Sequence, residues 1–197
     1  EIYLAKGEGL QFNFCEGKLE DFRLSKESGA GLRVLVEQKL GFAYTNNVPI
    51  DNAIIDEAYA NASGSTADKY YLFPEKNSYY PDICKLILED TNLKKISLDE
   101  KMKRVKVQES IALNTDKRVK KVLRASYSEG YGENTIVNSQ GISLGYRASF
   151  CSFGMAVLAE DKGQVQIGMD VQHRRFFQDI EFEKVTLCAT NKALGLL

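Results

Sequence analysis

The stretch that decides the fold is residues 142–171, ISLGYRASFCSFGMAVLAEDKGQVQIGMDV. Apolar residues alternate with small or polar residues on both sides of the polar group Glu-Asp-Lys-Gly at 160–163. Strict alternation is typical of a strand with one buried face. A short polar group that contains glycine, placed between two such runs, is typical of a hairpin turn. The stretch therefore predicts two long antiparallel strands.

The same period of two recurs toward the amino terminus, in shorter pieces. Polar turns separate four predicted strands, at residues 10–14, 19–24, 32–36 and 41–45. The glycines of Ser-Gly-Ala-Gly at 28–31 predict a break between two of these strands, and Glu-Gly-Tyr-Gly at 129–132 predicts another turn. Short strands joined by short turns indicate an antiparallel meander.

Helical periods lie between the strands. Asp51 is placed as the N-cap of a first helix, and Ser97 with Glu100 three residues later forms a capping box for a second. Pro81 is expected to open a short helix through Leu88, and a last helix follows Asp179. The predicted class is α+β, with antiparallel sheets packed with helices in two similar α/β layers in tandem. The predicted boundary lies between residues 96 and 97.

Composition limits the function. The chain has 197 residues, is 44% hydrophobic and carries a net charge of −1, which is typical of an ordinary globular protein. A single histidine cannot build a zinc site with two or three histidines. No run of about 18 apolar residues and no signal peptide is present. We therefore expect a cytoplasmic protein without a membrane partner, and the uncapped apolar end at 193–197 suggests a fragment of a longer chain.

Catalytic candidates are few. Cys84 and Cys151 are considered as nucleophiles with His173 as the base, which would make a thiol-dependent hydrolase. Cys151 lies in the middle of a predicted strand beside Phe150, so we favour a buried thiol. His173 is at the end of a predicted strand and is interpreted as an exposed residue or one at the rim of the sheet. The sequence assigns no catalytic residue, no metal ligand and no cofactor to this chain.

One segment, residues 94–124, is basic. It holds eleven Lys or Arg residues against four acids, Asp99, Glu100, Glu109 and Asp116. A solvated helix face followed by a lysine-rich edge strand is the favoured interpretation; an acidic partner is the alternative. Nucleic acid is not expected, because the whole chain is not a polycation. The residues of the possible partner surface are Arg118, Lys120, Lys121 and Arg124.

Several short motifs occur in an order that resembles the TldD/PmbA family, whose members are often labelled modulators of DNA gyrase. They are GAGLRV at 29–34, GFAYTN at 41–46, VNSQG at 137–141, AED at 159–161, and FQD at 177–179 leading into EKV at 183–185. The second half is more similar to PmbA (also called TldE) than to TldD. The resemblance implies an amino-terminal domain at 1–96 and a central domain at 97–197, with the carboxyl-terminal domain absent.

In TldD-type members the zinc motif His-Glu-x-x-x-His lies beyond the region covered here, and PmbA-type members lack it and pair with TldD. No catalytic or metal residue of the family maps onto this chain. The resemblance implies a non-catalytic, substrate-handling and dimer-forming part of a zinc peptidase assembly that processes peptides. Its partner would be a second copy or a TldD-type subunit, which would hold the zinc. The alternative is an interaction module that modulates a DNA-associated enzyme such as DNA gyrase.

Overall fold

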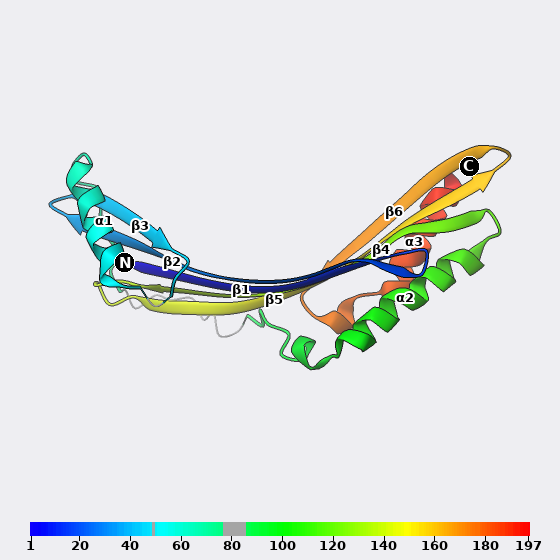
Figure 1. Ribbon diagram of the computed structural model, residues 1–197, viewed down its shortest axis with the longest axis horizontal. Helices are drawn as coiled ribbons and strands as arrows, with labels where there is room; N and C mark the ends of the chain where they lie inside the picture. Colours follow the sequence, from blue (N-terminus) through cyan, green and yellow to red (C-terminus); the bar gives the residue numbers. More distant parts are fainter. Residues whose placement is uncertain (49, 77–85) are drawn as a thin grey trace. The chain divides into compact units, whose positions relative to one another are not determined.

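Alternating apolar residues build six strands, which form one antiparallel sheet in the order β3-β2-β1-β4-β5-β6 (Figure 1). The computed structural model describes residues 1–48, 50–76 and 86–197. The strands are β1 (Ile2–Cys15), β2 (Lys18–Val36), β3 (Lys39–Thr45), β4 (Val119–Val137), β5 (Ser143–Asp161) and β6 (Gln164–Arg174).

Two-residue turns join β1 to β2, β2 to β3 and β5 to β6. The two turn residues have positive φ in each case, for example 48° at Lys162 and 82° at Gly163. This geometry matches the right-handed twist of the flanking strands. It sets the register of the last hairpin, in which Asp161 lies opposite Gln164 and Cys151 lies opposite Arg174. The predicted turn at 160–163 is confirmed.

Two of the predicted breaks are wrong, because residues 28–31 lie within β2 and residues 129–132 lie within β4. Their glycines leave room for aromatic rings rather than turning the chain. A Cβ atom on Gly31 would lie 3.1 Å from the Phe42 ring, and one on Gly130 would lie 2.4 Å from the Phe150 ring. Both glycines therefore allow side chains to cross the strand.

The helices are α1 (Asn52–Gly64), α2 (Leu98–Thr115) and α3 (Phe182–Gly195), with short 3-10 turns η2 (Leu93–Lys95) and η3 (Phe177–Asp179). The Asp51 side chain accepts from the Ile54 N–H, and the Ser97 hydroxyl accepts from the Glu100 N–H, each at 3.2 Å. Both predicted N-caps are confirmed, as is the α+β class. Most of the predicted helix at 81–88 lies outside the described residues.

The chain divides into two units, each assembled from separate segments. Unit 1 contains Glu1–Glu8, Lys26–Leu88 and Gly132–Ala148, whereas unit 2 contains Gly9–Ser25, Glu89–Tyr131 and Ser149–Leu197. Four strands, β1, β2, β4 and β5, therefore contribute one part of their length to each unit. A division between residues 96 and 97 remains a prediction.

In unit 1, helix α1 lies against strand β3 (Figure 1). The contact is close because Gly41 has no side chain, and a Cβ atom there would lie 1.9 Å from the Ala58 carbonyl oxygen. Ala58 and Ala62, one helical turn apart, are fully buried at this contact. The small core of this unit adds Leu32 and Ala43.

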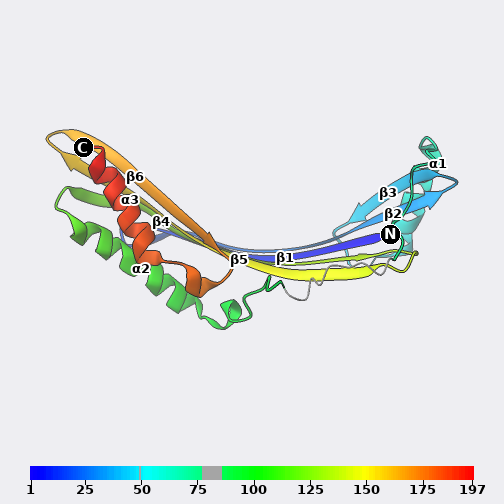
Figure 2. The same ribbon diagram turned by 180° about the vertical axis from the view of Figure 1, so that it is seen from behind.

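Unit 2 contains the larger core, under helices α2 and α3, which lie side by side (Figure 2). Aromatic rings fill it, with ring centres 5.2 Å apart for Phe12 and Tyr127 and 4.9 Å apart for Phe153 and Phe182. Helix α3 lies against β6, where a Cβ atom on Gly168 would lie 2.0 Å from the Ala189 carbonyl oxygen. Both units therefore use an edge-strand glycine under a pair of helical alanines, which here are Ala189 and Ala193.

Candidate functional site

The four residues of the predicted partner surface lie together in unit 2, at the turn before β4 and along its first residues. Arg118 binds Asp116 with two hydrogen bonds, of 2.8 and 3.1 Å, and holds the pKa of that carboxyl down to about 2. Lys121 forms an ion pair with Glu16 at 3.1 Å, and Lys120 donates to a main-chain carbonyl. Arg124 is exposed.

Other basic residues of the 94–124 segment are engaged within the fold. Lys101 is buried in an ion pair, and Arg104 pairs with Glu100 while its guanidinium lies 5.1 Å from the centre of the Phe177 ring. The Lys94 ammonium lies 4.3 Å from the centre of the Tyr131 ring. Much of the positive charge of this segment therefore stabilises the fold, which leaves a smaller exposed basic surface than the sequence alone indicates.

The partner of Lys101 is Glu129, and together they form a buried polar cluster. The Lys101 ammonium donates to one Glu129 carboxylate oxygen at 2.8 Å, and the Tyr127 hydroxyl donates to the other at 2.6 Å. Burial, with the hydrogen bond to Glu129, raises the pKa of Tyr127 above its ordinary value. A buried ion pair is tolerated only when its remaining groups are hydrogen-bonded in this way. The cluster is a structural element of the unit 2 core.

The proposed nucleophile and base do not form a catalytic pair within the described residues. Cys151 is fully buried, its thiol donates to the Arg174 carbonyl at 3.5 Å, and burial raises its pKa to about 12. A thiol with so high a pKa is not a nucleophile near neutral pH. His173 is exposed on β6, and Cys84 lies outside the described residues. The core location predicted for Cys151 is confirmed.

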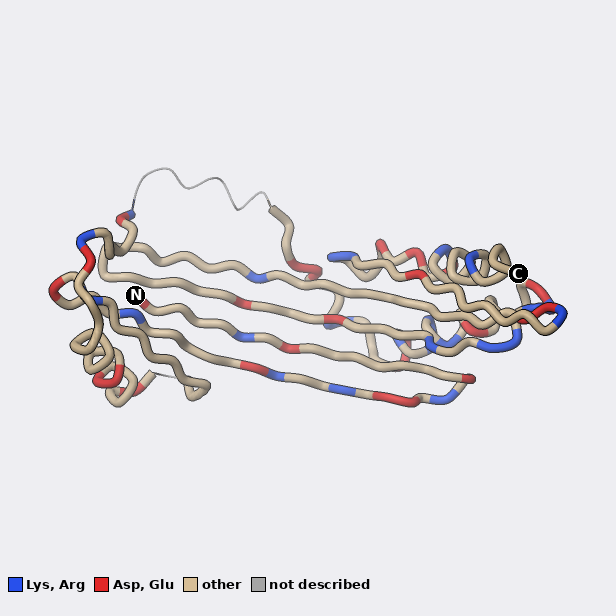
Figure 3. The backbone as a smooth tube through the Cα atoms, turned by 90° about the horizontal axis from the view of Figure 1, so that it is seen from above, with Lys and Arg blue, Asp and Glu red and all other residues tan. Residues whose placement is uncertain are grey.

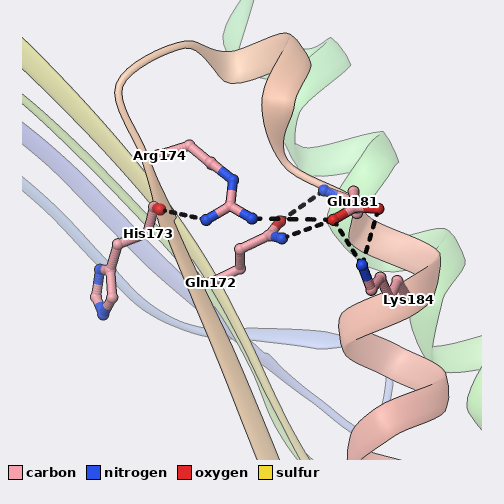
Figure 4. Close-up of polar contacts among 5 residues, drawn as sticks. All are labelled: Gln172, His173, Arg174, Glu181 and Lys184. Atoms are coloured by element: carbon pink, nitrogen blue, oxygen red, sulfur yellow. Dashed lines mark hydrogen bonds and ion pairs between the residues drawn. The ribbon is translucent and has the colours of Figure 1, made fainter.

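A groove between β6 and α3, which the sequence did not predict, is lined by residues 170–174 of β6 and by Lys184, Val185 and Cys188. Glu181 is the N-cap residue of α3 (Figure 4), and its carboxylate accepts from Gln172 at 3.0 Å and from Lys184 at 3.1 and 3.2 Å. These donors lower the pKa of the Glu181 carboxyl, and Lys184 has the largest effect. The His173 ring points away from this group (Figure 4). The Glu181 carboxylate is therefore engaged by side chains of both β6 and α3.

Among the described residues, no group of three or more His, Cys, Asp or Glu side chains could hold a metal ion. Across the same part of the chain, no helix is both long and apolar enough to span a bilayer. The described part of the chain therefore supplies no set of zinc ligands.

Comparison with known proteins identifies the family. Residues 1–62 match the PmbA/TldA metallopeptidase domain 1 family, and residues 91–197 match the PmbA/TldA metallopeptidase central domain family. The chain is 25% identical over 204 residues to Metalloprotease MJ0996 of Methanocaldococcus jannaschii, covering 100% of this chain and 44% of that protein. It is 23% identical to Metalloprotease PmbA of Escherichia coli O157:H7, covering 84% of this chain and 37% of that protein.

Solved structures share the fold. A Thermotoga maritima protein named for a suggested role as modulator of a DNA gyrase superposes with a TM-score of 0.88 at 20% identity, over 100% of this chain and 44% of that one. TldE from Thermococcus kodakarensis superposes with a TM-score of 0.83 at 16% identity, over 98% and 43%. The chain spans less than half the length of each of these relatives. It belongs to the TldD/PmbA family of metallopeptidase-related proteins.

Proposed function

We propose that this chain is a non-catalytic, substrate-handling part of a TldD/PmbA-type zinc peptidase assembly that processes peptides. The observation that carries the proposal is the match of residues 1–62 and 91–197 to two domains of the PmbA/TldA metallopeptidases. The described residues offer no zinc ligand set, and in this proposal a catalytic subunit of the TldD type holds the metal. The chain would act as a homodimer or as a heterodimer with that subunit.

Substrate handling requires a surface that accepts an extended chain of many sequences. An unfolded peptide can add to an unpaired strand edge through main-chain hydrogen bonds, which depend little on sequence. Most of strand β5 does not offer such an edge, because β6 pairs with it from Cys151 to Asp161.

Strand β2 offers a longer open edge. Strand β3 pairs with β2 only from Ala30 to Val36, which leaves residues 18–29 without a strand on that side among the described residues. Lysine, arginine, aspartate and glutamate all occur between Lys18 and Glu27 (Figure 3). Charges of both signs favour no single peptide charge, which suits a sequence-tolerant site. We therefore propose that peptides add along residues 18–25 of this edge, which lie within unit 2.

The test measures binding of an unstructured, fluorescently labelled peptide of twelve residues to the full-length protein. N-methylation of alternate amides leaves one peptide edge able to form ladder bonds, so this peptide should bind nearly as well as the unmodified one. N-methylation of consecutive amides blocks both edges. Loss of three hydrogen bonds of about 1 kcal/mol each should weaken binding by roughly 100-fold. Equal binding of all three peptides would refute strand addition.

The second candidate is an interaction module that modulates a DNA-associated enzyme such as DNA gyrase. It depends on the basic segment, of which Lys101, Arg104, Arg118 and Lys121 form ion pairs within the described chain. Charge reversal at Lys120, Lys121 and Arg124 should weaken such a partner and leave peptide processing intact. We rank this function second because few of the basic side chains remain available.

A further inference from the structure

The edge strand β6 has a sequence that is nearly the same in both directions. Residues 164–172 read QVQIGMDVQ, and Gly168 is the centre. Moving outward from this glycine, the matched positions are Ile167 and Met169, Gln166 and Asp170, Val165 and Val171, and Gln164 and Gln172. A strand of this kind presents the same chemistry to a copy of itself that runs in the opposite direction.

One face of β6 is apolar and exposed. Its even-numbered face lies toward α3, because a Cβ atom on Gly168 would point at the Ala189 carbonyl. The odd-numbered side chains lie on the opposite face, and their exposed fractions are 51% for Val165, 47% for Ile167, 66% for Met169 and 56% for Val171. A row of four exposed apolar side chains on one face of an edge strand is unusual, because edge strands are normally protected by charged residues.

The backbone of β6 is also open on one side. It is the last strand of the sheet, and among the described residues only β5 pairs with it. A second open edge, residues 18–29 of β2, carries charges of both signs (Figure 3), whereas the odd-numbered row of β6 from Val165 to Val171 carries none. The two edges therefore differ in the protection they have against pairing.

We propose that β6 strands from two copies of this chain pair antiparallel about Gly168 and form a two-fold contact. This inference deepens the assembly part of the proposed function. A two-fold contact requires a self-complementary surface, in which each position faces its symmetry mate. The near-palindrome meets this requirement, and an unrelated partner would not call for it. Val165 then faces Val171 of the second copy, and Ile167 faces Met169.

Charge is compatible with this pairing. The acid nearest the centre, Asp170, would face Gln166 of the second copy, so no like charges are opposed. Asp170 is already neutralised by Lys192 at 2.6 Å. The Lys192 ammonium also donates to the Met169 carbonyl at 3.1 Å. A carbonyl oxygen has two lone pairs and can accept a ladder hydrogen bond in addition.

The contact area sets the expected strength. A pair of nine-residue strands buries less than the roughly 1,200–2,000 Å² of a standard stable interface. We therefore expect a reversible contact, with a dissociation constant on the order of micromolar where β6 acts alone. If the full-length protein buries more area around this contact, the two copies will bind each other more tightly.

The first experiment is site-specific photocrosslinking. The full-length protein carries p-benzoylphenylalanine in place of Met169, and light and 15N-labelled chains are mixed before irradiation. The expected product joins a light chain to a heavy chain and maps to residues 165–171 of the second copy. The control places the same group at Val107 on α2, which is 50% exposed and should give no such product. A crosslink confined to one chain, or to a different protein, would overturn the proposal.

The second experiment is sedimentation equilibrium of Met169→Lys, which folds normally because the side chain is exposed. In the pair, the two ammonium groups would lie two residues apart, about 7 Å along the strands. Like charges at this position should weaken association at least 10-fold, whereas the control Val107→Lys leaves it unchanged. Unchanged association of Met169→Lys would overturn the contact. Peptide binding is measured separately, so its failure would count against the proposed function and not against the β6 contact.

Discussion

Replacement of Lys101 by methionine tests the energetics of the buried cluster. The substitution keeps the length of the side chain and removes its charge, so Glu129 is left buried with only the Tyr127 hydroxyl as a donor. The two side chains are 4% and 8% exposed. Breaking such a pair on one side costs about 3–5 kcal/mol, because one charge remains uncompensated. We expect that loss in the free energy of unfolding, measured by urea titration followed by circular dichroism.

The control is an ion pair with similar geometry on the surface. Arg147 and Glu133 lie 3.2 Å apart with side chains 65% and 43% exposed, so Arg147→Met should cost no more than about 1 kcal/mol. The double variant Lys101→Met with Glu129→Gln removes the stranded charge and should recover part of the loss. A loss for Lys101→Met no greater than that of the surface control would refute the reasoning.

Three further predictions concern packing, pH and reactivity. Gly168→Ala should lower the free energy of unfolding by about 3 kcal/mol or more, measured by thermal denaturation, because its Cβ would lie 2.0 Å from a carbonyl oxygen. The control Gly195→Ala should be nearly neutral, because a Cβ there has no atom within 4 Å. Equal effects of the two substitutions would contradict the close contact. The carboxylate of Asp116, with its pKa lowered from 3.8 to about 2, stabilises the fold above pH 4 and loses this effect as the pH falls toward 2. The stability difference between wild type and Asp116→Asn should therefore shrink over that range, and a constant difference in acid urea titrations would exclude the linkage. Native Cys151, with a pKa raised to about 12, should resist iodoacetamide at pH 8 while half-buried Cys188 reacts; rapid native labelling of Cys151 would restore the thiol hydrolase hypothesis.

Local patterns predicted the elements of this fold well. The alternation of residues 151–171 and its turn, and the caps at Asp51 and Ser97, depend only on neighbours in the sequence, and all appear as expected. The glycines at 28–31 and 129–132 misled the prediction, because a glycine that admits a ring from another strand has the same composition as a turn. Only the neighbouring strand, with Phe42 or Phe150, distinguishes the two cases.

The surface residues were harder to predict, because their state depends on partners distant in the sequence. Lys101 reads as one more charge on a basic helix, yet its partner Glu129 lies 28 residues away on β4. Lys121 likewise pairs with Glu16 across 105 residues. The hydrogen-bonded group around Glu181 has no local signal, since Gln172 reaches Glu181 from another element. Of the functional predictions made from the sequence, the family resemblance is the one that is confirmed.

The central claim is that the chain handles peptides for a zinc subunit and does not cleave them itself. The most direct measurement is cleavage of an unstructured, quenched fluorescent peptide by the full-length protein with zinc, alone and then with a TldD-type subunit. The account predicts no turnover by the protein alone and turnover by the pair that exceeds that of the TldD-type subunit alone. Turnover by the full-length protein alone, or no gain from adding it to the TldD-type subunit, would contradict the claim.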